Sequence, residues 1–535
     1  MPDTYPGQPT GPDVSQRTID AVKAALSSGR GVPGDPDVLA KATTQGWSIA
    51  TGAVGLLLES PAKNLFPVLS PIRNWMSRHG APNGASAVQW RAITGINVSG
   101  LKAGVADGLR NAVISSSERD RTQAFKSFGL DDFVTYDAQD TAQGFMDLRA
   151  EATANLLAAV MVEEEKLILG GNTTALGPPA FVSANITDVP GAVVGPLTAA
   201  TPFDVSVTAL TQYGYLNGAT GHGTADSPDE TQGQVLVATH TSGGGVTSWL
   251  LTGYATRGAV AYNVFIGTSG GTRYYAFTTT ATRISIVTAA GYATFVGAPA
   301  TYPVATYGTP VILAALPVAG NVPNTNDLTG DALSFDGMIP QFQANANSQY
   351  RDATAGSLFL GGGYYRDMLG AQFTADNANG INEIDLMLKT LWDTSRIGPT
   401  RIIVNSQEAE SMGKLLTQGG VGLGTVRWNQ QIGPDGAVTG GLVADSYRNK
   451  FTSPRIVPIE IHPYLAPGTV VALSERLPFP RTNVPTPFQL EVLREYTSYD
   501  WANVQRRWEF GVYGRECLKC YFPAGTACLV GVQAS

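Results

Sequence analysis

The longest uninterrupted helical pattern in the chain covers residues 143–171. Alanine, leucine, methionine and glutamate dominate it, and all four residue types favour helix. Its apolar residues follow the three-and-four spacing that places side chains on one side of a helix, namely Phe145, Leu148, Ala152, Leu156, Ala159 and Val160, with a second set of Leu157, Met161, Leu167 and Ile168. Gly170 and Gly171 supply a C-terminal stop. At about 1.5 Å per residue, roughly 26 residues would form a rod about 39 Å long.

Three consecutive acids, Glu163, Glu164 and Glu165, lie near the C-terminal end of this pattern. Negative charge is unfavourable at that end of the helix dipole. We therefore expect the three carboxylates to face water or a cation of a partner. By itself, the stretch predicts either an ordinary amphipathic core helix or a long helix that supports an otherwise β-rich fold.

The low content of charged residues constrains the surface of the molecule. Charged residues make up 15% of the 535 residues, against about a quarter in typical globular proteins. A chain of this length can bury a large core and divide into several domains. We expect much of its surface to be covered by copies of the same chain. The formal charge of −8 argues against a protein that grips nucleic acid through its phosphates, although a shell that merely encloses nucleic acid is compatible with it.

The first 85 residues have the pattern of an extended segment, and we expect the apolar part from about 45 to 85 to lie against another part of the protein. Residues 1–45 are rich in proline, glycine and aspartate, with one short helical pattern at 18–26, and resemble an extended arm. Residues 46–80 alternate apolar pieces with three prolines. The N-terminus has neither the basic nor the apolar region of a signal peptide, and the longest apolar run, 47–58, is too short to span a bilayer. We expect a soluble protein, synthesised in the cytoplasm, that does not bind a membrane.

Two strand-like pieces follow, at residues 85–96 and 121–136, where apolar and polar side chains alternate. A span rich in glycine and serine separates them. Together they predict a long two-stranded ribbon. Because an isolated ribbon is only marginally stable in water, this one should lie against a partner surface.

Residues 190–320 differ sharply in composition from the rest of the chain, with only seven charged residues. Short alternating strands recur at 202–210, 233–239, 247–255, 259–268, 273–279 and 282–290, which predicts an antiparallel sandwich. Residues 258–271 resemble the middle strand of a fibronectin type III or bacterial immunoglobulin-like module. We interpret the region as a domain inserted into a host fold, with the alternative that its strands belong to the host sheet.

After this region the sequence predicts mixed helix and strand. Residues 380–393 predict a helix, and residues 401–404 a buried strand followed by a helix that Asn405 or Ser406 caps. The glycine-rich span 419–441 is typical of a mobile loop. The last 80 residues predict strands.

The sequence contains no recognisable catalytic, cofactor-binding or metal-ligating constellation, so we expect no enzyme. The four histidines, which are His79, His222, His240 and His462, follow no metal-ligand spacing, and no nucleophile elbow or phosphate-binding loop occurs in its required setting. Cys517 and Cys520 form a CxxC, but Cys528 is the only further ligand candidate nearby. Since the surrounding residues alternate like a strand, we expect three reduced, structural thiols.

The order of arm, ribbon, long helix, mixed lobe and returning strands resembles that of the major capsid proteins of tailed phages, which have the Hong Kong 97-type shell fold. Five segments carry the resemblance: QWRAITGI at 89–96, the stretch 126–172, HPYLAPGTVVALSERLPFP at 462–480, EYTSYDW at 495–501 and EFGVYGRECLKCYFP at 509–523. The resemblance covers nearly all of the chain outside residues 1–45 and the insert.

The resemblance implies an α+β subunit, and it assigns a role to each segment. These roles are an N-terminal arm at 1–85, an extended loop at 86–135, a spine helix of the peripheral domain at 136–171, an axial domain at 172–189 and 321–486, an inserted immunoglobulin-like β-sandwich at 190–320, and closing strands of the peripheral domain at 487–535.

The function implied by the resemblance is assembly. Such subunits form pentamers and hexamers of an icosahedral shell, which encloses the double-stranded DNA genome of a tailed bacteriophage without sequence-specific binding. A portal protein, and scaffolding or decoration proteins, are the other partners of such a shell, and the location is the virion capsid. We expect assembly contacts at Trp90, Arg91, Phe125, Lys126, Phe128, Phe145, Leu148, Leu156, Glu163, Glu164 and Glu165. Two alternatives stay open, an encapsulin-like compartment and a secreted immunoglobulin-like adhesin.

Some members of this fold crosslink covalently through a lysine of the extended loop and an asparagine. Lys102 and Lys126 lie in the loop region, but no matching asparagine-and-acid signature accompanies them. We therefore expect no crosslink.

Overall fold

The computed structural model describes residues 69–82, 84–96, 104–105, 107–111, 113, 115–142, 147–190, 202–217, 228–233, 238–241, 246–288, 311–313, 317, 319–343, 363–376, 380–418, 445–478, 482–484, 486–502 and 504–533. Residues 1–68 of the predicted arm, with the helix at 18–26, lie outside these residues, as do Lys102, Phe145, His222 and the loop 419–441. The chain divides into one unit of Met1–Phe66 with Asp140–Asp147 and a second of Pro67–Gln139 with Leu148–Ser535. Everything below concerns the second unit.

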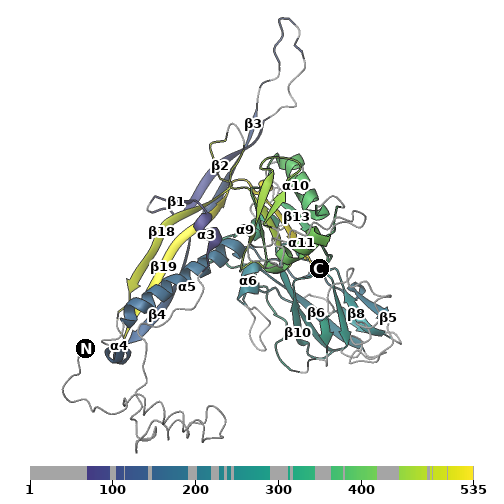
Figure 1. The fold of residues 1–535 in the computed structure, drawn as a ribbon. Helices are drawn as coiled ribbons and strands as arrows, with labels where there is room; N and C mark the ends of the chain where they lie inside the picture. Colours follow the sequence, from purple (N-terminus) through teal and green to yellow (C-terminus); the bar gives the residue numbers. More distant parts are fainter. Residues whose placement is uncertain are drawn as a thin grey trace, which may run out of the picture. The chain divides into compact units, whose positions relative to one another are not determined.

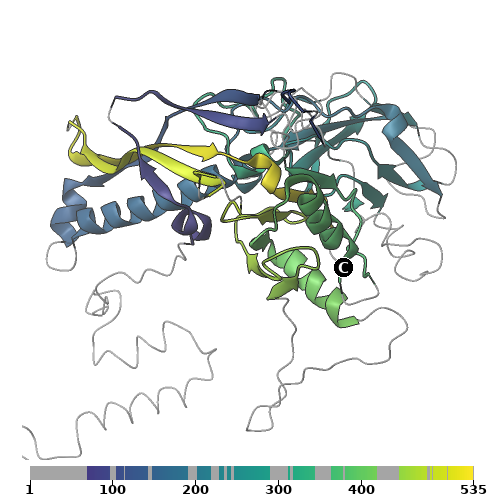
Figure 2. The same ribbon diagram turned by 90° about the horizontal axis from the view of Figure 1, so that it is seen from above.

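The predicted long helix is present as α5 (Leu148–Gly170), and it packs on a four-stranded sheet. The strand order is β1 (Arg78–Gly80), β18 (Phe488–Asp500), β19 (Arg507–Cys520) and β4 (Lys126–Thr135). Only the β1–β18 pair is parallel. Buried side chains of the helix and the sheet, namely Val134, Leu156, Val160, Phe510 and Val512, form the contact. Figure 2 shows the blue helix running alongside the yellow strands β18 and β19.

The predicted ribbon is present, but it is shorter than expected. β2 (Ala87–Ile96) and β3 (Ser116–Ala124) pair in antiparallel fashion (Figure 1). The second predicted strand is in fact two strands, which meet at the buried Phe125. Beyond this residue the chain becomes β4 and pairs with β19, so the last ten residues assigned to the extended loop belong to the sheet. Alternation shows where a strand lies but not which strand it pairs with, and that is why the sequence merged the two.

The strands of residues 186–313 form two four-stranded sheets of their own. One sheet has the order β10 (Tyr274–Thr279), β9 (Ala261–Thr268), β6 (Pro202–Leu210) and β7 (Ala238–Thr241). The other has the order β12 (Val311–Leu313), β11 (Ile284–Thr288), β8 (Val246–Leu251) and β5 (Ile186–Pro190). Phe203, Trp249, Tyr262 and Ile286 belong to one buried cluster that both sheets share. The alternative that these strands join the host sheet is therefore wrong for the described residues.

A six-stranded sheet forms the mixed lobe. Its order is β13 (Tyr364–Asp367), β20 (Ala527–Val530), β17 (Val470–Leu473), β14 (Arg401–Val404), β16 (Ile456–Ile461) and β15 (Ser446–Arg448). The predicted helices are present as α10 (Asn382–Ser395) and α11 (Ser406–Gln418), and both share a buried cluster with the sheet. β20 lies inside this sheet. The expectation that residues 487–535 all close the peripheral sheet is therefore wrong for this strand.

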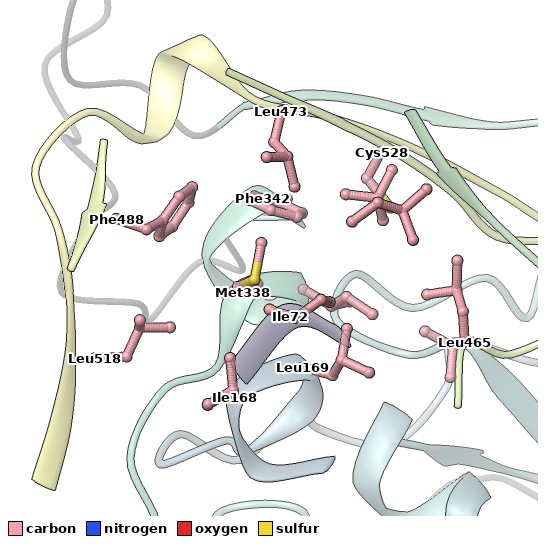
Figure 3. Close-up of a cluster of buried hydrophobic side chains, with 14 of the residues drawn as sticks. Ile72, Ile168, Leu169, Met338, Phe342, Leu465, Leu473, Phe488, Leu518 and Cys528 are labelled. Carbon is pink, nitrogen blue, oxygen red and sulfur yellow. The ribbon is translucent and has the colours of Figure 1, made fainter. Parts of the chain in front are cut away.

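One apolar cluster joins the two sheets and their helices. Figure 3 shows side chains converging from distant parts of the sequence, and they include Ile72 of α3 (Pro71–Trp75), Ile168 and Leu169 of α5, Met338 and Phe342 of α9 (Met338–Gln343), Leu473, Phe488, Leu518 and Cys528. The four-stranded and six-stranded sheets therefore share a core, and α5 ends inside it.

The three cysteines are free and buried, as predicted. Burial raises the pKa of Cys517 to about 12, and it raises the pKa of Cys520 as well. Within the described parts of the chain, no helix combines the length and the apolar character needed to cross a membrane. The same parts hold no group of three or more metal-ligating side chains.

Candidate assembly interface

The β2–β3 ribbon is buried at its base and exposed towards its connection. Arg121 and Gln123 of β3 are buried, whereas Ser116, Glu118 and Asp120 are exposed. Large apolar side chains are exposed in this part and in the connection, namely Ile93 of β2 (68% exposed) and, between the strands, Val105 (47%), Leu109 (70%) and Val113 (84%). These exposed apolar residues make this part of the chain a candidate for contact with another chain.

Arg91 is the one predicted assembly residue in the exposed part of the ribbon. Its Nε lies 2.8 Å from Asp120 Oδ1 and its Nη1 lies 3.4 Å from Glu118 Oε2, across the strand pair. The guanidinium holds the pKa of Asp120 below its usual range through a hydrogen bond. All three side chains are exposed, so water screens the interaction and it adds little stability. Arg91 is opposite Asp120 in the strand register, and the pair leaves the apolar residues uncovered.

Four other predicted residues contact their own chain. The ring of Trp90 lies 5.8 Å from that of Tyr521 in an edge-to-face arrangement, and the Phe125 side chain is 4% exposed. The half-buried Phe128 packs in the core under α5, and Lys126 Nζ donates a hydrogen bond to the carbonyl of Ala332. These four side chains therefore contact groups of the same chain.

The predicted helix residues behave in the same way. Leu156 is 6% exposed, and the half-buried Leu148 packs in the same cluster against the sheet. Phe145 lies outside the described residues. The helix therefore presents its predicted apolar side chains to its own sheet.

The prediction that Glu163, Glu164 and Glu165 face water or a partner's cation is wrong for the last two, which are both 0% exposed. Their partners are groups of the same chain, Arg73 and Arg78 for Glu164 and His462 for Glu165. The half-buried Glu163 accepts a hydrogen bond from Tyr213 Oη and lies 3.4 Å from Lys166 Nζ. The helix dipole alone does not decide where these carboxylates lie, because arginines from elsewhere in the chain fold onto the helix and pair with Glu164.

An aromatic pocket of about 620 Å³ lies on the four-stranded sheet, and the sequence did not predict it. Tyr499, Trp501 and Tyr513 line it with Arg494 and Arg515. The Tyr499 and Trp501 rings stack at 6.1 Å, and the Tyr513 ring meets each of them edge to face. Trp501 is 45% exposed. The alternation of aromatic residues in the segment 495–501 is the signal that could have identified this surface.

Two glycines allow Tyr513 to lie close to the sheet. A Cβ at Gly129 would meet Cδ1 of the tyrosine at 2.5 Å, and a Cβ at Gly511 would meet its Cε2 at 2.7 Å. Both distances are shorter than real Cβ contacts. The sheet therefore needs glycine at these positions so that the aromatic ring can pack on its backbone.

No protein-family model matches the chain, and no curated protein matches it. Among solved structures, the chain is similar to the capsid of a native GTA particle, with 7% identity and a TM-score of 0.42 over 94% of this chain and 100% of that one. It is similar to the capsid of cyanophage A-1(L), with 9% identity and a TM-score of 0.44 over 90% and 98%. A third similarity is to the capsid of Myoviridae phage XM1, with 7% identity and a TM-score of 0.37 over 91% and 100%.

Proposed function

We propose that this chain is the major capsid protein of a tailed bacteriophage and assembles with copies of itself into an icosahedral shell. The observation that carries the proposal is the β2–β3 ribbon with its connection, in which Ile93 of β2 is 68% exposed and Leu109 and Val113 of the connection are 70% and 84% exposed. A two-stranded ribbon is marginally stable alone in water. A second copy of the chain that covers these residues would remove their apolar surface from water and stabilise the ribbon.

The arrangement of the elements supports the finer assignment to the Hong Kong 97-type fold. A ribbon precedes a long helix on a four-stranded sheet, a six-stranded lobe follows, and the β18–β19 hairpin returns to the first sheet. In this assignment α5 is the spine helix, the four-stranded sheet is the peripheral domain and the six-stranded sheet is the axial domain. The two sheets of residues 186–313 are an immunoglobulin-like insertion, an assignment that their shared core supports.

The proposed mechanism is repeated contact between copies, with no chemical step. Pentamers and hexamers would tile the shell, and each copy would contribute the same surfaces, so weak contacts add up over the particle. The shell would enclose double-stranded DNA without binding its sequence, which suits the net charge of −8. A portal protein, together with scaffolding or decoration proteins, completes the set of proposed partners. The proposed location is the virion, after synthesis in the host cytoplasm.

Electron microscopy of the purified full-length chain tests the proposal. We expect closed particles of uniform diameter from the wild type, and subunits that stay unassembled from the double variant Ile93→Asp, Leu109→Asp. The matched control is Thr122→Asp, because Thr122 is an exposed polar residue of the same ribbon. The control adds a charge without removing apolar surface and should still assemble.

Monomers of the wild type at high concentration, measured by light scattering, would contradict the proposal. A protein cargo in place of double-stranded DNA in particles from infected cells would favour the encapsulin-like alternative. Export of the chain from the cell in which it is made would favour the adhesin.

A further inference from the structure

The aromatic pocket on the four-stranded sheet contains two arginines that face the same space. Arg494 of β18 and Arg515 of β19 are directly opposite each other in the strand register, and both line the pocket. Phe510 and Val512 of β19 pack against α5, so the side chain of Arg515 points to the other face of the sheet. Like charges directly opposite each other on two strands are destabilising. The pocket therefore concentrates positive charge on the face of the sheet away from the helix.

Neither guanidinium is neutralised by a carboxylate of the residues that the structure describes. Arg494 Nη1 donates a hydrogen bond to Tyr499 Oη. Arg515 Nε is shielded from water and, among the same residues, has no hydrogen-bond acceptor. A buried donor without an acceptor is unfavourable. An anion that entered the pocket would therefore gain a charge partner and satisfy this donor.

The acids around the pocket have other partners or lie in water. Asp131 of β4 accepts a hydrogen bond from Trp501 Nε1 at 3.1 Å, and the exposed Glu495 of β18 forms no ion pair within the described residues. The other acids of the β18–β19 hairpin pair with other cations, namely Glu491 with Lys519, Asp500 with Arg149, Glu509 with Arg507 and Glu516 with Arg78. The described part of the chain therefore leaves the charge of the two pocket arginines unbalanced.

The lining of the pocket favours a carboxylate that is attached to an apolar body. A guanidinium group offers forked N–H donors that match the two oxygens of a carboxylate. Beside the arginines, the rings of Tyr499, Trp501 and Tyr513 form an apolar wall, and Trp501 is 45% exposed. A volume of about 620 Å³ suits a small molecule or a few side chains and exceeds what a single ion needs. An acidic segment of a polypeptide combines both chemical groups.

Two other occupants match the pocket less well. Duplex nucleic acid presents a row of phosphates and needs several cations along it, whereas Arg494 and Arg515 are the only cations among the described residues that line the pocket. The ribbon connection of a second copy carries Lys102 and Arg110 on either side of Asp107, so it would bring positive charge to the two arginines. Charge complementarity therefore favours a separate, acidic partner.

We propose that this pocket binds a partner protein through an acidic segment, in which a carboxylate pairs with Arg494 and Arg515 and a neighbouring apolar side chain packs on Trp501. The bound carboxylate supplies the acceptor for Arg515 Nε and places negative charge between two like charges. This partner is additional to the copies of the proposed shell. The pocket belongs to a single subunit, so binding requires no assembly.

Fluorescence polarisation with labelled peptides tests the pocket on the full-length, unassembled chain. The probe is a dye-labelled pentapeptide, Ala-Asp-Leu-Asp-Ala with a blocked C-terminus, and its matched control has asparagine in place of both aspartates. We expect the acidic peptide to bind about tenfold or more tightly than the control, the factor that one charge-assisted hydrogen bond contributes. The difference should shrink as salt is added, because ions screen exposed charges.

Variants of the chain show whether the peptide binds in this pocket. Arg494→Gln combined with Arg515→Gln should lower the affinity for the acidic peptide about tenfold or more and leave that for the control peptide unchanged. Trp501→Ala should weaken the binding of both peptides, because it removes part of the apolar wall. The matched control is Arg507→Gln, on the same face of β19, whose guanidinium pairs with Glu509. This variant should bind the acidic peptide as the wild type does.

Equal affinities of the wild type for the two peptides would overturn the proposal, as would unchanged binding in the variant that combines Arg494→Gln with Arg515→Gln. Displacement of the acidic peptide by a duplex DNA fragment would assign the pocket to phosphates and would also overturn it. Peptide binding should persist in assembled particles, and its loss on assembly would assign the pocket to a neighbouring copy and overturn the proposal. Subunits that bind the peptide but form no shells would support this site and contradict only the proposed function.

Discussion

The β2–β3 ribbon and the C-terminal half of α5 both place arginines against carboxylates, but in opposite surroundings. In the ribbon, the Arg91 and Asp120 side chains are 64% and 46% exposed. At the end of α5, Glu164 is 0% exposed and its partners Arg73 and Arg78 are 13% and 24% exposed. A pair in water can open at little cost, whereas a buried pair that loses one member leaves a charge without a partner. The proposed function makes the ribbon a surface that a second copy covers, whereas the end of α5 is a junction within one chain.

The largest expected effect comes from removing the centre of the buried junction. Glu164→Ala leaves two guanidinium groups without their carboxylate, and we expect a loss of about 3–5 kcal/mol in the free energy of unfolding. Urea denaturation of the unassembled subunit measures it. Glu164→Gln, which keeps the shape and one acceptor oxygen, should lose less. A loss from Glu164→Ala no larger than that from a surface substitution would show that the junction does not hold the fold.

A substitution that breaks α5 should have the second largest effect on stability. Leu157 lies inside the helix and is 37% exposed, so it contributes little to the core. Leu157→Pro removes a backbone hydrogen bond and introduces a clash, which costs about 3 kcal/mol or more. The expected result is a lower melting temperature and no shells by electron microscopy. The control, Leu157→Ala, should assemble, and shells from Leu157→Pro would refute the role of α5 as the spine.

A buried acid in the six-stranded lobe provides a pH test that is independent of the junction. Burial raises the pKa of Glu408 to about 7, against hydrogen bonds such as that from the Gly468 backbone N–H at 2.7 Å. Because the folded value is raised, the stabilising contribution is present below about pH 4.5 and is lost as the pH rises through about 7. The shift corresponds to about 3 kcal/mol at most. Chemical denaturation across this pH range should show that the free energy of unfolding of the wild type decreases as the pH rises, and that Glu408→Gln abolishes the decrease. The same pH dependence in Glu408→Gln and the wild type would contradict the assignment.

The smallest effect should come from the exposed ribbon pair. Asp120→Ala removes the carboxylate from Arg91 in full contact with water, so the stability of the unassembled subunit should not change measurably. Urea denaturation checks this expectation alongside Glu164→Ala. A loss of similar size in the two variants would mean that the contrast between the two regions is wrong.

Much of the fold could be predicted from local patterns, because they report on the strand or helix in which they occur. The alternation at 202–210 predicted β6 with its bounds, and the three-and-four spacing within 143–171 predicted α5, which spans Leu148–Gly170. Pairing between distant segments left no such signal. We predicted β3 and β4 as one strand, and we placed β20 among the closing strands of residues 487–535. Nothing in a strand's own residues identifies the strand with which it pairs.

Burial within the chain was predicted less well than the fold, for a related reason. Trp90, Phe125 and Leu156 were chosen as apolar or aromatic residues on the right segments, but the folded chain covers them itself. Ile93 belongs to the same strand as Trp90 and is 68% exposed. Trp90 is partly covered by Tyr521, a residue more than 400 positions away. Burial is a property of the whole chain, and a local pattern does not contain it.

The central claim is that the ribbon is incomplete until another copy covers it, whereas the junction at the end of α5 is complete within one chain. Hydrogen exchange of unassembled subunits and of purified particles, at one pH, compares the two regions directly. The backbone amides of β2 and β3 should gain strong protection on assembly, and those of residues 160–170 should be equally protected in both states. Equal protection of the ribbon in subunits and particles would contradict the claim.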